Sequence, residues 1–116
     1  MAEKRVQPRY RKRFSLRFTD LDGTNEGANR LSFTEDISLH GIFIKTAYVI
    51  RPGSCIEIVL TLPGGEVRLK AKVMWAKKVQ ASFLHRISKA GMGVRITEFL
   101  EGEELYTSLL HELDKG

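Results

Sequence analysis

Two arginines near the N-terminus have the type and spacing to bind an anion. Arg5 and Arg9 lie four residues apart in the stretch EKRVQPRYRKR, where Pro8 disfavours a regular helix. A guanidinium group can donate two parallel hydrogen bonds to a phosphate or to the O6 and N7 edge of guanine, and its flat face can stack on a base. Two such groups on an arm could close over a guanine nucleotide.

A second polar cluster lies in the stretch DISLHG, residues 36–41. Alternation places Asp36 and Ser38 on one outer face of a predicted strand, and Gly41 permits a turn that other residues resist. A carboxylate can accept hydrogen bonds from guanine N1–H and N2–H₂, a hydroxyl can serve phosphate or base, and glycine leaves room for close approach. Taken alone, the cluster is better described as a polar strand end followed by a glycine turn.

No catalytic or metal-binding constellation is predicted. The three histidines, His40, His85 and His111, are scattered, and Cys55 has no neighbour that would activate it. DLDG at 20–23 lacks the glutamate that a calcium loop needs, and no phosphate-cradling glycine loop precedes a helix. We therefore expect a binding protein without cofactor, not an enzyme, with Cys55 as a buried thiol in an apolar strand.

The positive charge is concentrated at one end of the chain. Residues 1–17 hold seven of the 19 Lys and Arg residues and one of the 14 Asp and Glu residues. This asymmetry favours an anionic partner for the arm (a nucleotide, a nucleic acid or a membrane surface), and the alternative is a solubilising tail. No apolar stretch could span a bilayer or act as a signal peptide, so we expect no membrane insertion and a cytoplasmic location.

The two polar clusters must be positioned by strands, since most of the chain alternates with a period of two. Six strands are predicted, with a loop at 20–29, a turn at Pro52-Gly53, a hairpin turn at 63–65, and no assignment for 77–90. The residues expected to face the core are Phe14, Leu16, Phe18, Leu31, Phe33, Ile37, Ile42, Ile44, Ile56, Ile58, Leu60, Leu62, Val67, Leu69, Ala71, Val73, Trp75, Met92, Val94 and Ile96.

A helix is predicted at about 102–114, where leucines and Tyr106 recur at helical spacing after an acidic first turn. Six half-apolar strands need a closed surface, and a helix can cap one end of it. We therefore predict an all-β fold: a six-stranded antiparallel β-barrel over 13–116 that includes the C-terminal α-helix, preceded by a flexible basic arm over 1–12.

An R-x-x-x-R pair before the first strand and D-x-S-x-x-G between the second and third strands resemble the PilZ domain family. The resemblance runs over nearly the whole chain and includes the strand with Trp75 and the G-M-G-V strand at Gly91. It implies a bacterial receptor for cyclic di-GMP, a second messenger, with a role in motility or biofilm regulation. Carried over, the ligand-binding residues are Arg5, Arg9, Asp36, Ser38 and Gly41, with Lys4 as a lesser contributor.

The register of the arm stays open, because Arg9 with Arg13 and Arg13 with Arg17 have the same spacing. A shifted arm could use Arg11 or Arg13 instead. An arm with so little to bury should become ordered only when an anion supplies contacts. The signal would then be a changed surface for an unidentified downstream protein, or a change in self-association such as a homodimer.

Two alternative functions remain open. One is a PilZ-like adaptor that works through protein contacts and binds no nucleotide, against which the presence of both motifs counts. The other is a small barrel that binds single-stranded nucleic acid, with the arm on its phosphates. That function needs aromatic side chains on the outer face, and alternation puts only Phe43 there, beside Tyr10 in the arm, so nucleic acid is the less favoured ligand.

Overall fold

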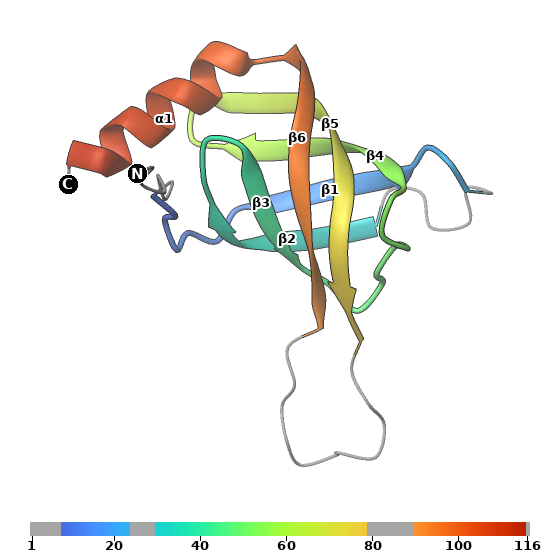
Figure 1. Cartoon of the computed structure of the whole chain (residues 1–116). Helices are drawn as coiled ribbons and strands as arrows, with labels where there is room; N and C mark the ends of the chain where they lie inside the picture. Colours follow the sequence, from blue (N-terminus) through green and yellow to red (C-terminus); the bar gives the residue numbers. More distant parts are fainter. Residues whose placement is uncertain (1–7, 24–29, 79–89, 116) are drawn as a thin grey trace, which may run out of the picture.

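The computed structural model describes residues 8–23, 30–78 and 90–115 and shows a closed antiparallel barrel. The strands follow one another around it in the order β1-β2-β3-β6-β5-β4 (Figure 1). The predicted six-stranded barrel with a C-terminal helix is therefore confirmed. The elements are β1 Ser15–Asp20, β2 Arg30–Ile37, β3 Gly41–Lys45, β4 Cys55–Leu62, β5 Gly65–Lys77, β6 Gly91–Glu101 and α1 Glu103–Lys115.

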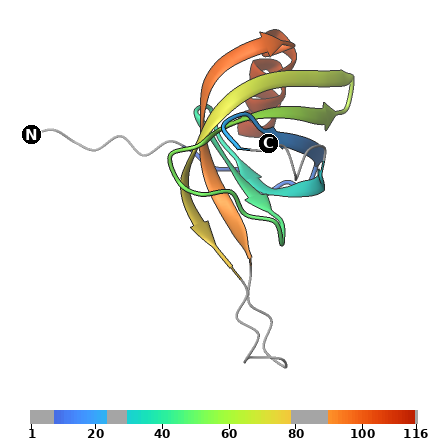
Figure 2. The same cartoon turned by 90° about the vertical axis from the view of Figure 1, so that its right-hand side faces the viewer.

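The core fills the barrel with the side chains that alternation points inward, and α1 lies across one end (Figures 1 and 2). Tyr106 and Leu110 of α1 are buried in the same cluster. β5 and β6 are the longest strands, and both run on past the body of the barrel. The predicted inward faces of β1, β3 and β4 are confirmed, as are Val67, Leu69, Ala71, Val73, Met92 and Val94.

The predicted inward face of β2 is wrong over its first half. Leu31 is 56% exposed, while Ser32 and Thr34 are buried. The Thr34 hydroxyl accepts a hydrogen bond from Phe14 N–H at 2.9 Å and donates one to Lys12 O at 2.6 Å, so it ties β2 to the chain entering β1. A register shift between Thr34 and Asp36 then reverses the alternation, which brings Ile37 into the core as predicted.

Trp75 and Cys55 are also placed differently from the prediction. A register shift between Val73 and Trp75 turns the indole outward, and it is 46% exposed. Cys55 is exposed because Ile56 takes the inward position at the start of β4. The predicted buried tryptophan and buried thiol are therefore both wrong.

The observed turns agree with the predicted turns more closely than these side chains do. Gly53 has a φ of 96°, and Ser54 N–H donates to Arg51 O, as a type II turn at Pro52-Gly53 requires. The β4–β5 hairpin is one residue tighter than predicted, because Leu62 already pairs with Gly65. The sequence predicts no element for 77–90; in the structure β5 extends to Lys77, and 79–89 lie outside the described residues.

Candidate functional site

Four of the five predicted site residues line one groove on the outside of the barrel. The groove has a volume of about 460 Å³ and lies between the arm, the β2–β3 turn and the outer faces of β5 and β6. Arg5 lies outside the described residues. The lining residues are Arg9, Asp36, Ser38, His40, Gly41, Ile42, Phe43, Met74, Trp75, Gly93, Val94 and Arg95.

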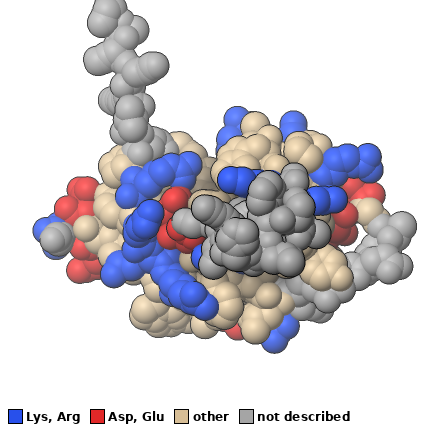
Figure 3. Space-filling view, turned by 90° about the horizontal axis from the view of Figure 1, so that it is seen from below, with Lys and Arg blue, Asp and Glu red and all other residues tan. Residues whose placement is uncertain are grey.

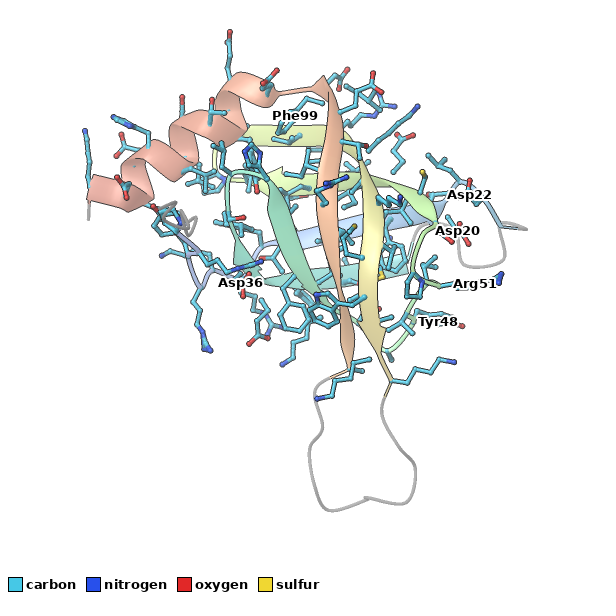
Figure 4. All side chains as sticks on the ribbon, viewed as in Figure 1. Asp20, Asp22, Asp36, Tyr48, Arg51 and Phe99 are labelled. Atoms are coloured by element: carbon cyan, nitrogen blue, oxygen red, sulfur yellow. The ribbon has the colours of Figure 1, made fainter. Side chains whose placement is uncertain are left out.

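Arg9 and Asp36 form an ion pair at the mouth of this groove. Arg9 Nη1 lies 2.7 Å from Asp36 Oδ1, with the side chains 56% and 19% exposed. The next residues in the two segments fix the pair, since Tyr10 N–H donates to Ile37 O and Ile37 N–H donates to Tyr10 O. Figure 4 shows Asp36 on the side of the barrel where the arm crosses β2. A two-residue backbone bridge thus brings the two sequence motifs together.

The turn from Ser38 to Gly41 is held by three hydrogen bonds between its two end residues. Ser38 N–H donates to Gly41 O at 2.9 Å, Gly41 N–H donates to Ser38 Oγ at 3.1 Å, and Ser38 Oγ donates to Gly41 O at 3.2 Å. Ser38 is buried, so its predicted place on the outer face beside Asp36 is wrong, and its hydroxyl bonds within the turn. A Cβ on Gly41 would lie 3.0 Å from Val94 O, so glycine allows the turn to approach β6 closely.

An aromatic pair forms the other wall of the groove. The rings of Phe43 and Trp75 lie 5.1 Å apart, tilted by 53°. Gly93 pairs with both residues across the sheet, and a Cβ there would collide with the indole of Trp75. Sequence reasoning missed Trp75 as a groove residue because a bulge reverses the alternation. The glycines of G-M-G were the available signal, since a strand glycine often marks a close approach by another group.

The groove has basic neighbours. Arg95 lines it and lies directly opposite Lys72 on β5, and neither is ion-paired within the described ranges. Two like charges at one cross-strand position repel each other, and a bound anion would relieve the repulsion. Lys and Arg side chains also gather on the face turned downward in Figure 1, around a small acidic patch (Figure 3).

The floor of the groove is supported from inside the barrel. Tyr106 of α1 is buried, and its hydroxyl donates to Ser38 O at 2.6 Å. Burial is the main cause that raises the pKa of Tyr106; the charge of Arg9 lowers this pKa and that of Asp36 raises it. The Tyr106 hydroxyl thus supports the turn from inside the barrel, two residues along the chain from Asp36.

Two other classes of site receive no support from the described part of the chain. Among 8–23, 30–78 and 90–115, no three His, Cys, Asp or Glu side chains come together as a metal site would require. The same residues include no helix with the length and apolar character needed to cross a membrane.

A model of the PilZ domain family matches residues 3–113 of the chain. No curated protein matches. Among solved structures of similar fold, MotI/DgrA, the inhibitor of motility from Bacillus subtilis, has a TM-score of 0.70 at 16% identity, covering 99% of this chain and 54% of its own. The PilZ domain of YcgR from Escherichia coli with c-di-GMP has a TM-score of 0.61 at 14% identity, covering 97% and 93%.

MrkH from K. pneumonia in complex with c-di-GMP is similar too, with a TM-score of 0.70 at 17% identity, covering 97% of this chain and 52% of its own. The chain therefore spans about half the length of MotI/DgrA and of MrkH, and most of the length of the YcgR domain. At these identities the likeness concerns the fold.

Proposed function

The chain belongs to the PilZ domain family, and from this premise we propose that it is a receptor for cyclic di-GMP. The observation that carries the proposal is the meeting of Arg9, Asp36, Ser38 and Gly41 in one groove. Arg9 lies 27 positions before Asp36, the first of the other three residues, and the fold brings the two segments together. YcgR and MrkH, which share the fold, are described with c-di-GMP, and this supports the same ligand here.

Each groove residue has a chemistry that suits part of this ligand. Asp36 can accept from guanine N1–H and N2–H₂, and its two oxygens have room for these donors besides Arg9. Arg9 can donate to a phosphate or to the guanine O6 and N7 edge, with Arg5 as the second guanidinium of the arm. Ser38 and Gly41 set the turn beneath the base, and Trp75 offers a face on which a base can stack.

The arm is the moving part in this proposal. Arg9, Tyr10 and Lys12 already contact β2 or α1, so the arm of residues 1–12 would close over the ligand about these anchored positions while the barrel of 13–116 stays fixed. Arg9 would either keep its ion pair with Asp36 while it binds the nucleotide, or leave Asp36 and bind the nucleotide instead. The closed arm would present a new surface to a downstream protein or to a second copy of the chain. The protein would act in the cytoplasm as a ligand-responsive binding module, without catalysis and without a cofactor.

Calorimetric titration with cyclic di-GMP tests the proposal, with GTP and a short single-stranded oligonucleotide as comparison ligands. We expect selective, saturable binding of cyclic di-GMP. A folded protein that binds none of the three would support the protein-contact adaptor. Binding of the oligonucleotide alone would overturn the nucleotide site in favour of a nucleic-acid barrel.

Two variants test the site, and a third serves as their control. Arg9→Ala and Asp36→Asn should each weaken cyclic di-GMP binding by roughly tenfold or more, because each removes a hydrogen bond to or from a charged group. Arg51→Ala is the matched control, since Arg51 is an exposed arginine on the opposite side of the barrel from Asp36 (Figure 4). If all three variants bind as the unmodified protein does, the groove is not the site.

A further inference from the structure

Helix α1 reaches the underside of the nucleotide groove through one side chain. Tyr106 is fully buried, and its hydroxyl donates a 2.6 Å hydrogen bond to the carbonyl oxygen of Ser38, 68 residues away in sequence. The tilted ring of Phe99 packs against it at 5.5 Å. A buried hydroxyl and a buried carbonyl each need a partner, and here each satisfies the other.

The carbonyl that Tyr106 holds belongs to the turn that shapes the groove. The N–H and hydroxyl of Ser38 form the hydrogen bonds that close the turn onto Gly41. Asp36 lies two residues earlier, at the end of β2, with its carboxylate paired to Arg9. A contact to the Ser38 carbonyl therefore acts on the residue that closes the turn, two positions from the Asp36 carboxylate.

The same helix also contacts the arm. Tyr10 donates its hydroxyl to Asp114 Oδ1 at 2.7 Å, while its backbone bridges Ile37. Tyr106 and Asp114 are eight residues apart on α1, which is about 12 Å along the helix axis. One rigid element thus touches the turn at one point and the arm at another.

We propose that Tyr106 is a positioning residue of the nucleotide site, through which α1 fixes the Ser38–Gly41 turn and the carboxylate of Asp36. The proposal rests on the function proposed above. Tyr106 touches no ligand, because it lies beneath the turn and is sealed from solvent. Its contribution is to hold the turn in its ligand-binding geometry before the nucleotide arrives, so that binding does not have to order it.

Tyr106→Phe removes only the hydroxyl and tests the assignment. We expect a roughly three- to tenfold weaker affinity for cyclic di-GMP, the size of one hydrogen bond, measured by calorimetry where the variant is fully folded. In the ligand-free protein, the NMR amide signals of Ser38, His40 and Gly41 should shift. A purely structural role would lower the melting temperature and leave both readouts unchanged.

Ile58→Val is the matched control, because it loosens the core on β4, across the barrel from the groove. It should lower the melting temperature while the affinity and the turn signals stay as in the unmodified protein. If Tyr106→Phe behaves like Ile58→Val, the positioning role is overturned.

The failure of the proposed function can be distinguished from the failure of the positioning role of Tyr106. A chain that does not bind cyclic di-GMP at all fails the proposed function, yet the amide shifts of Tyr106→Phe still report whether the hydroxyl positions the turn. Should Tyr106→Phe fail to fold, Phe99→Leu takes its place, since it lets the Tyr106 ring move and keeps the hydroxyl. Shifted turn signals in that variant support the proposal, and unchanged signals overturn it.

Discussion

Trp75 has the residue type and exposure of a stacking platform. Its indole lies against Gly93 and Phe43, so the ring is held in place, and the residue lines the groove and is 46% exposed. An exposed aromatic ring that is already fixed can bind a flat base at little cost in side-chain entropy. It is therefore the groove residue that would recognise the face of guanine, whereas Asp36 would recognise its edge.

We predict that Trp75→Ala weakens cyclic di-GMP binding by roughly 5- to 150-fold, because base stacking on an aromatic side chain is worth about 1–3 kcal/mol. Titration calorimetry measures the change. Trp75→Phe should retain much of the affinity, since a ring remains. Leu31→Ala serves as control for loss of an exposed apolar side chain away from the groove. Equal affinities for Trp75→Ala and Leu31→Ala would exclude stacking.

At the level of elements, β2 shows what the sequence could and could not predict. Strict alternation is a good guide where a strand stays regular, as the inward faces of β1, β3 and β4 show. It fails at the register shifts beside Asp36 and Trp75, because one extra residue reverses which side chains face inward. Both failures lie at the groove. The D-x-S-x-x-G motif is enough to predict Asp36 as a site residue. The outward position of Trp75 cannot be predicted without knowing the pairing of β5 with β6.

Thr34 and Ser32 provide a test of why β2 turns polar side chains inward. Both hydroxyls are buried, yet Thr34 bonds Phe14 N–H and Lys12 O, while Ser32 Oγ has no partner among the described residues. Thr34→Val should lower the free energy of unfolding by about 1–3 kcal/mol, since it leaves backbone groups unpaired. Ser32→Ala should be nearly neutral. Urea denaturation measures the free energy of unfolding of both variants. Equal decreases would show that the hydrogen bonds of Thr34 do not stabilise the fold more than the unpaired hydroxyl of Ser32 does.

Two glycines separate the steric cost of a side chain from its conformational cost: Gly102, between β6 and α1, and Gly53, in the turn before β4. Gly102 has a φ of 83°, and a Cβ there would lie 2.9 Å from Glu66 O; Gly53 has a φ of 96° with open space around it. Gly53→Ala should cost roughly 1 kcal/mol of unfolding free energy from backbone strain alone. Gly102→Ala should cost more, because the helix must also move away from β5. Denaturant titrations giving the same loss for both would contradict this account.

At the scale of the whole molecule, the charge distribution separates the two candidate ligands. The net charge is +5, with seven basic residues within the first 17. Arg11, Lys12, Arg13 and Lys45 line a hollow beside Glu35, apart from the groove that Arg9 and Asp36 line. A polyanion has enough phosphates to contact both this hollow and the groove, whereas a cyclic dinucleotide has only two.

Salt dependence should therefore differ between the two ligands. An oligonucleotide held by the four basic residues of the hollow would lose roughly 50-fold in affinity between 50 and 200 mM salt, since each neutralised phosphate of a single strand contributes a slope of about −0.7. Cyclic di-GMP should lose only about a few-fold, because its contacts are few and partly shielded from solvent. Affinity measured by fluorescence anisotropy across this salt range gives both slopes.

Lys12→Ala sharpens the comparison, because Lys12 lines the hollow but not the groove. It should lower the oligonucleotide slope by about 0.7 and leave the affinity for cyclic di-GMP unchanged. A steep slope for cyclic di-GMP that falls in Lys12→Ala would mean that the arm attracts the dinucleotide through its overall charge. Binding would then depend on the field of the arm and not on the hydrogen bonds of Asp36 and the turn.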